Sequence, residues 1–190
     1  MSTLRWIILA VCAAFLLSAG GATAAVTVMG NGLAAECSSA AQTMANNRPS
    51  RSEAVQACTL ALDGEPLSRH EFAATYVNRG VLYLSGSAVA DARHDFDQAL
   101  KIEPKLPEAM VDRGAALMAG GDDRGGAAEI TRGLALDPVE PEKAYYNRAV
   151  AEERLGDLRS AYFDFLKASE LKPDWSLPKA ELMRFKVSQP

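Results

Sequence analysis

Residues 74–104, ATYVNRGVLYLSGSAVADARHDFDQALKIEP, carry the pattern from which most of the chain is built. Tyr76 and Gly80 are four positions apart, so they share one face of a helix. A Gly-Ser pair follows, in which Ser87 is placed to cap a second helix. Pro104 ends that helix, because proline cannot continue the backbone hydrogen bonds. The stretch therefore predicts two short antiparallel helices joined by a tight turn.

The two predicted helices have small residues where they would cross. Gly80 and Ala92 let the axes approach closely, and Phe96 fills the space beside them. A single hairpin of this kind leaves one apolar face uncovered. It therefore needs similar hairpins as neighbours.

The same pattern recurs along the chain at a spacing of about 34 to 38 residues, which is in the range of stacked helical repeats. A proline closes each copy, at Pro66, Pro104, Pro138 and Pro173. A shared tripeptide occurs in three copies, as Asn78-Arg79-Gly80, Asp112-Arg113-Gly114 and Asn147-Arg148-Ala149. The position of the large residue also recurs, as Phe96, Ile130, Phe165 and, upstream, Cys58.

Together these matches resemble the tetratricopeptide repeat family, well over residues 73–174 and more weakly over 35–66. The resemblance implies an all-α fold, a right-handed α-solenoid. We expect three clear hairpins, a degenerate N-terminal one and a C-terminal capping helix. The expected hairpins cover about 33–66, 70–104, 107–138 and 141–173, and the capping helix about 174–187.

Two hairpins depart from the family pattern. Glu152 stands where the family has a large apolar residue, which predicts a looser core in the fourth hairpin. The third hairpin contains Gly125 and Gly126 within a predicted helix. Glycine inside a helix costs about 1 kcal/mol relative to alanine, so we expect this hairpin to be the softest.

Residues 1–24 are predicted to be a signal peptide. Arg5 precedes a continuous apolar run over residues 6–17, which is too short to cross a bilayer comfortably. Ala22-Thr23-Ala24 fits the small-x-small rule for cleavage. The alternative is an uncleaved N-terminal anchor. We expect an exported repeat domain of residues 25–190, periplasmic or secreted.

Cys37 and Cys58 are the cysteines that remain after this cleavage, and a single pair in an exported protein suggests a disulfide. It would tie together the two helices of the degenerate hairpin. The alternative is a thiol-disulfide or small-ligand protein that uses this pair. C-x-x-C spacing and a neighbouring histidine, which that chemistry would favour, do not occur.

The sequence shows no set of residues for catalysis, so we expect a non-enzyme without cofactor or metal. The two histidines, His70 and His94, fall on different predicted helices and pair with no nucleophile. Asp91, Asp95 and Asp97 are interpreted as a solvated helix face. A net charge of −4 with no basic stripe argues against nucleic acid.

The family resemblance implies a concave groove lined by the first helix of each hairpin, and hence a partner-binding scaffold. The candidate groove residues are Asn78, Val81, Asp112, Lys143, Tyr146 and Asn147. Two of them, Asn78 and Asn147, match an asparagine with which some family members hold peptide backbone or a terminal carboxylate. Asp112 would repel a carboxylate. We therefore expect an unidentified protein or peptide segment of the cell envelope as partner.

Two alternatives stay open for these recurring polar residues. Asn78 and Asn147 would instead bond only to neighbouring helix termini. The arginines Arg79, Arg113 and Arg148 recur too, and their spacing predicts salt bridges between repeats, each worth little at a surface.

Overall fold

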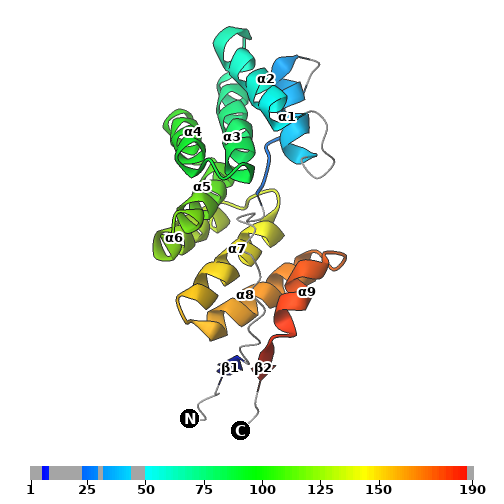
Figure 1. The fold of residues 1–190 in the computed structure, drawn as a ribbon, viewed down its shortest axis with the longest axis vertical. Coiled ribbons are helices and arrows are strands. Elements are labelled where there is room, and N and C mark those ends of the chain that lie inside the picture. The colour runs from blue at the N-terminus through cyan, green and yellow to red at the C-terminus, as the bar shows by residue number, and fades with distance from the viewer. Residues whose placement is uncertain (1–5, 9–22, 30–31, 44–49, 188–190) are drawn as a thin grey trace.

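The computed structural model describes residues 6–8, 23–29, 32–43 and 50–187. Its helices pair in chain order into antiparallel hairpins that stack along the long axis of the molecule (Figure 1). Their bounds are α1 Leu33–Gln42, α2 Arg51–Gly64, α3 Arg69–Ser85, α4 Val89–Ile102, α5 Pro107–Ala119, α6 Asp123–Leu134, α7 Pro141–Arg154, α8 Leu158–Leu171 and α9 Ser176–Leu182. The predicted all-α solenoid is therefore confirmed.

Two short strands lie at one end of the solenoid and not at its centre (Figure 1). β1 (Trp6–Ile8) pairs antiparallel with β2 (Phe185–Val187). The last helix is consequently shorter than the expected 174–187, because the chain leaves α9 at Leu182 and extends into β2. Most of the predicted signal peptide, residues 1–5 and 9–22, lies outside the described residues.

The beginnings of the helices follow their capping residues. Ser50 and Ser68 each form a reciprocal capping box with the glutamate three residues later. The predicted cap at Ser87 is wrong. Ser87 has a positive φ of 61° and completes the turn, and α4 begins after Ala88 without a side-chain cap.

The second and third hairpins close where a small residue on the first helix meets a large one on the second. A Cβ atom on Gly80 would lie 2.6 Å from Phe96 Cε1, and one on Gly114 would lie 2.6 Å from Ile130 Cγ1. In the third hairpin Gly126 also faces Gly114, with its own added Cβ only 2.8 Å from the Gly114 carbonyl oxygen. The glycines that cost helix propensity thus allow the two backbones to touch. The softness of this hairpin stays a prediction.

An arginine next to each of these small residues pairs with an acid 16 positions later, across the same hairpin. The pairs are Arg79–Asp95 at 2.7 and 2.9 Å, Arg113–Glu129 at 2.6 and 3.1 Å, and Arg148–Asp164 at 2.6 and 2.9 Å. Each arginine also bonds to the preceding hairpin, at Thr59, Asp97 and Thr131 respectively.

These pairs correct two sequence interpretations. The main acid partner lies within the same repeat, and of the three recurring arginines only Arg113 forms the predicted salt bridge between repeats, with Asp97. Asp95 does not belong to a solvated face, because only 1% of it is exposed. Its hydrogen bonds raise the pKa of Arg79 above its ordinary value. A buried charge of this kind requires its partner.

The first hairpin replaces the aromatic contact with a covalent one. Cys37 on α1 and Cys58 on α2 form a disulfide with their Cα atoms 4.9 Å apart. Both residues are 0% exposed, so no solvent reaches the sulfurs in the folded chain. The bond takes the place that Phe96 fills in the second hairpin.

Glu152 on α7 is an acid with incomplete partners in the fourth hairpin. Its Oε1 lies 3.8 Å from Arg148 Nε, and its Oε2 is buried without a hydrogen bond. Burial, with help from the charge of Asp164, raises the pKa of Glu152 from 4.5 to about 7. The acid at this position thus leaves a partly buried titratable group in the fourth hairpin.

Removing Asp95 should strongly destabilise the fold, since Arg79 would keep a half-buried charge without its acid. We expect Asp95→Ala to lower the free energy of unfolding by about 3 kcal/mol in urea denaturation. Asp91→Ala is the matched control, because Asp91 is exposed on the same helix. Equal effects of the two substitutions would contradict the role of the pair.

Glu152 should make stability fall as the pH rises. Its pKa is raised in the folded state, so its contribution is present below pH 4.5 and is lost as the pH rises through about 7. At pH 8 we expect Glu152→Gln to raise the free energy of unfolding by roughly 1–2 kcal/mol relative to the parent, and so to unfold at a higher temperature. At pH 4.5 the two proteins should differ little. Glu170→Gln is the control, because this side chain is 57% exposed. It should leave the unfolding temperature unchanged at both pH values.

Loss of the Cys37–Cys58 bond should destabilise the packing of α1 against α2 in the first hairpin. The bond encloses 21 positions of chain, and the chain-entropy model gives about 3 kcal/mol for such a loop. We expect the double variant Cys37→Ala, Cys58→Ala to lose a similar amount in urea denaturation under oxidising conditions. An unchanged unfolding midpoint would show that packing alone holds α1 against α2.

Candidate functional site

An extended segment of the chain itself lies along the first helices of the hairpins. We call residues 23–28 the strap, and the faces of α1, α3, α5 and α7 that it contacts the inner face. The strap runs as an uncoiled stretch past these helices (Figure 1). It meets α7 at Thr23, α5 at Ala24, α3 at Val26 and α1 at Val28. Successive hairpins therefore hold successive parts of one extended peptide.

The side chain of Asn78 on α3 binds the main chain of the strap. The side-chain oxygen accepts the Val26 N–H at 2.8 Å, and the side-chain nitrogen donates to the Val26 carbonyl at 2.8 Å. The amide thus makes both bonds that a neighbouring β-strand would make with one residue. Asn78 itself is fully buried. This contact is independent of the side chain at position 26.

Asp112 occupies the corresponding position on α5. Its Oδ1 accepts the Ala24 N–H at 3.1 Å. Its Oδ2 is buried and has no hydrogen-bond partner among the described residues. Burial raises the pKa of Asp112 well above its ordinary value, because the charged form loses its solvation.

Helix α1 holds the other end of the strap. Ser38 donates to the Val26 carbonyl at 2.9 Å and accepts the Val28 N–H at 3.1 Å. Gln42, one turn later, donates to the Thr27 hydroxyl at 3.0 Å. Ala24 and Val28 are buried, whereas Thr27 is exposed. The strap thus has one side against the helices and one side towards solvent.

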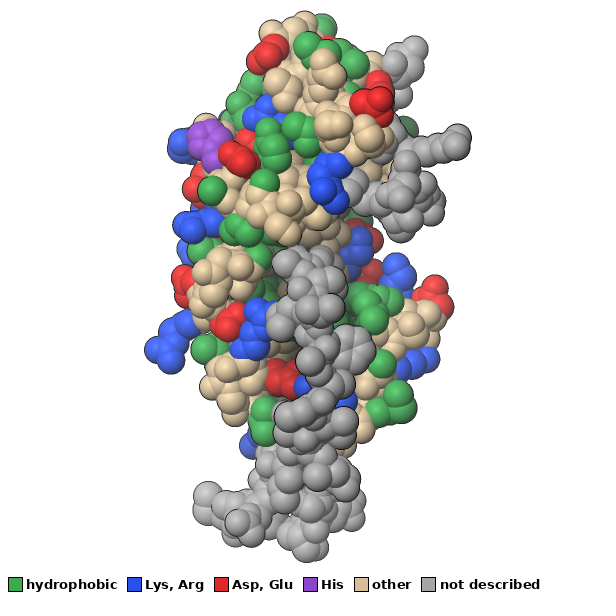
Figure 2. All heavy atoms as spheres, viewed as in Figure 1, with side chains coloured by type: hydrophobic (Ala, Val, Ile, Leu, Met, Phe, Trp, Pro, Cys, Tyr) green, Lys and Arg blue, Asp and Glu red, His purple; other side chains and the backbone are tan. Residues whose placement is uncertain are grey.

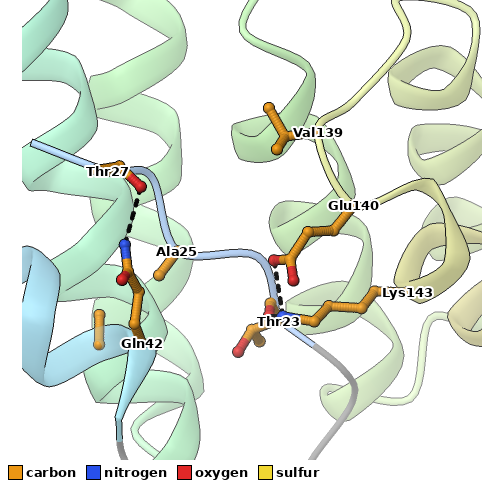
Figure 3. Close-up of a pocket in the computed structure, with 8 residues that line it drawn as sticks. Thr23, Ala25, Thr27, Gln42, Val139, Glu140 and Lys143 are labelled. Atoms are coloured by element: carbon orange, nitrogen blue, oxygen red, sulfur yellow. Dashed lines mark hydrogen bonds and ion pairs between the residues drawn. The ribbon is translucent and has the colours of Figure 1, made fainter. Parts of the chain in front are cut away.

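A pocket of about 520 Å³ lies beside the solvent side of the strap (Figure 3). Strap residues, the end of α1 and the start of α7 line it: Thr23, Ala25, Thr27, Ala41, Gln42, Val139, Glu140 and Lys143. Lys143 donates to the Thr23 carbonyl at 2.9 Å and to Glu140 at 2.7 Å. Val139 is 85% exposed at its rim.

The remaining candidate residues lie deeper than a free groove surface requires. Val81 is 2% exposed and belongs to the core. The Tyr146 ring packs against Phe165 and Trp175, with centroids 5.4 and 5.0 Å away, and burial raises its pKa to about 12. Asn147 is 1% exposed. Whether these residues contact a partner stays a prediction.

The sequence analysis did not identify the strap or the α1 residues that hold it. The strap carries a usable signal, because Val26, Thr27 and Val28 are successive β-branched residues that favour extended backbone. Ser38 and Gln42 are four positions apart and so share one face of α1. Neither signal indicates where in the fold the segment lies.

The described surface shows no concentrated chemistry elsewhere. Acidic and basic side chains are interspersed with apolar ones over the face in Figure 2. Within the described ranges, no cluster of His, Cys, Asp and Glu could hold a metal ion. None of the described helices has the length and apolar character needed to cross a membrane. The inner face can bind a peptide main chain.

A model of the tetratricopeptide repeat matches residues 142–174. No sequence among the curated proteins matches the chain.

Solved structures with a similar fold include tetratricopeptide repeat (TPR) domains and the protein MamA. The first TPR of Spaghetti (RPAP3), bound to the HSP90 peptide SRMEEVD, is 21% identical with a TM-score of 0.57, covering 60% of this chain and 93% of that chain. The Arabidopsis OM64 TPR domain is 22% identical with a TM-score of 0.57, covering 62% and 96%. MamA 41-end from Desulfovibrio magneticus RS-1 is 21% identical with a TM-score of 0.60, covering 82% and 84%.

At these identities the solved structures show a shared fold alone. The matched repeat at residues 142–174 is the fourth of the stacked hairpins, and the second and third hairpins have a small-to-large closure. Residues 142–174 therefore match the tetratricopeptide repeat, and the stacked hairpins share the fold of the solved repeat domains.

Proposed function

We propose that this protein is a non-enzymatic, exported interaction scaffold that binds an extended segment of a cell-envelope protein along its inner face. One observation carries the proposal: the inner face already holds an extended peptide, its own strap, by main-chain hydrogen bonds from Asn78, Asp112 and Ser38. A partner segment of the same form would meet the same donors and acceptors.

The shape of the contact indicates what kind of segment fits. Ala24 and Val28 are 2% and 7% exposed against the helices, so the inner face accommodates small or β-branched side chains at alternate positions. Asp112 disfavours a carboxylate at this place. The RPAP3 domain, which was solved with an HSP90 peptide, supports peptide binding by this fold. The partner proposed here is an internal or N-terminal segment and not a C-terminal tail.

Export is supported by the sequence together with the disulfide. The apolar run over residues 6–17 and the Ala22-Thr23-Ala24 site have the form of a cleavable signal. A buried structural disulfide is typical of proteins that fold outside the cytosol. The periplasm is the proposed location, and secretion is the alternative.

A thiol-disulfide or small-ligand function of Cys37 and Cys58 is the alternative, and the geometry does not favour it. Thiol exchange requires a thiolate to reach a sulfur. Both cysteines are 0% exposed. The pair is therefore best described as a structural bond.

The proposal predicts capture of a partner at the inner face only. A photo-cross-linking amino acid at Val139, on the rim of the pocket, should form an adduct with one cell-envelope protein, whereas one at Leu60 on α2 should not. A synthetic Thr-Ala-Ala-Val-Thr-Val peptide, which copies the strap, should reduce the adduct several-fold. The intact mass of the captured chain should lack residues 1–24.

A peptide with proline at the first valine is the matched competitor, because proline has no N–H for Asn78 to accept. It should leave the adduct unchanged. Equal adducts at Val139 and Leu60, or adducts that neither peptide reduces, would reject the inner face as the binding surface.

A further inference from the structure

Asp112 is a buried acid with a single, neutral hydrogen-bond partner among the described residues. It is fully buried on α5 and accepts one hydrogen bond, from the neutral Ala24 N–H at 3.1 Å. Its second oxygen has no partner among the described residues. A buried carboxylate is unfavourable unless both a counter-charge and further hydrogen bonds are present.

The charged neighbours of Asp112 compensate its charge only in part, since Lys143 favours the ionised form while two acids oppose it. Lys143 on α7 already donates to Glu140 and to the Thr23 carbonyl. Glu140 and Glu108 are acids and oppose ionisation of Asp112. Glu108 accepts the Val139 N–H at 3.0 Å. No ion pair in the described part of the chain includes Asp112, and burial raises its pKa well above its ordinary value.

The other hairpins show that a carboxylate is not needed to hold a strap N–H. Asn78 stands at the same position of α3 and accepts the Val26 N–H with a neutral amide oxygen. Asparagine also stands there in α7, as Asn147. An asparagine at position 112 would accept the Ala24 N–H equally well. The charge at this position therefore points to a ligand that carries the opposite charge.

We propose that Asp112 binds a free α-ammonium group, and that its natural ligand is the new N-terminus at Ala25 when the chain is cut after Ala24. An α-ammonium has three donors and a positive charge, so it can satisfy both oxygens of the carboxylate. The inference rests on the proposed function in two ways. Export would bring the cleavage after Ala24, and the inner face would provide the binding site.

The geometry of the strap brings this amine to the carboxylate. Val26 is held by both bonds to Asn78, so the residue before it has a fixed place. The Ala25 nitrogen is one residue from the nitrogen that Asp112 now binds, a rise of about 3.3 Å in extended chain. Once residues 1–24 are removed, Ala25 is free to turn its amine towards Asp112. The cut chain thus holds its strap by a charged contact, which the uncut chain lacks.

The experiment compares two peptides on the full chain. Val26→Pro weakens the resident strap, because proline removes the N–H that Asn78 accepts. The probes are Ala-Val-Thr-Val-Met-Gly with a free amine and the same peptide N-acetylated, titrated by calorimetry at pH 7. We expect the free amine to bind at least tenfold more tightly. In the Val26→Pro, Asp112→Asn variant the two peptides should bind alike.

Each outcome decides between the inference and the wider function. Equal binding of both peptides to Val26→Pro overturns the role of Asp112 and leaves peptide binding by the inner face intact. Binding of neither peptide overturns both. An advantage of the free amine that survives Asp112→Asn shows that another group reads it, and overturns the assignment.

A second measurement covers the case in which Asp112→Asn does not fold, as judged by circular dichroism. The preference for the free amine should decline as the pH rises above about 8, where an α-amine loses its proton. The affinity of the acetylated peptide should not follow that course. A preference that stays constant from pH 6 to pH 10 would overturn the proposal.

Discussion

The structure depends on two neighbouring contacts that close the second, third and fourth hairpins. A small residue on the first helix admits a large one from the second, as Gly80 admits Phe96 with no room for a Cβ atom. The residue before it, Arg79, reaches the acid beside the large residue, Asp95, at 2.7 and 2.9 Å. The apolar contact sets the distance between the helices and the ion pair sets their register. The buried ion pair adds specificity, because either partner alone would be an uncompensated charge.

The same tripeptide also builds the candidate site. Consecutive residues of a helix point about 100° apart, so the residue before the arginine faces away from the partner helix. In α3 this residue is Asn78, and in α5 it is Asp112, and both meet the strap. The side chains that bind the peptide are thus fixed by the contacts that close the hairpins. An inner face made in this way is preorganised, and it needs little ordering when a peptide binds.

The hairpins could be predicted from the sequence, whereas the strap could not. Helical periodicity and the recurring small and large residues are local signals, and a repeat presents them several times. The strap joins Val26 to Asn78 over 52 positions and Thr23 to Lys143 over 120 positions, and no local pattern encodes such contacts. The burial of Asp95 could not be predicted for a related reason. Its partner Arg79 lies on the other helix of the hairpin, and the sequence around Asp95 alone is that of a solvated helix face.

The presence of the strap changes how binding by this protein must be understood. Each main-chain hydrogen bond contributes on the order of 1 kcal/mol net, and the strap makes only a few of them. A tethered segment, however, competes at an effective concentration in the millimolar range. A partner must therefore exceed a weak but ever-present competitor, which excludes segments that offer only non-specific backbone contact. Selectivity then comes from what the strap lacks, which is side chains large enough to fill the pocket beside Lys143 and Val139.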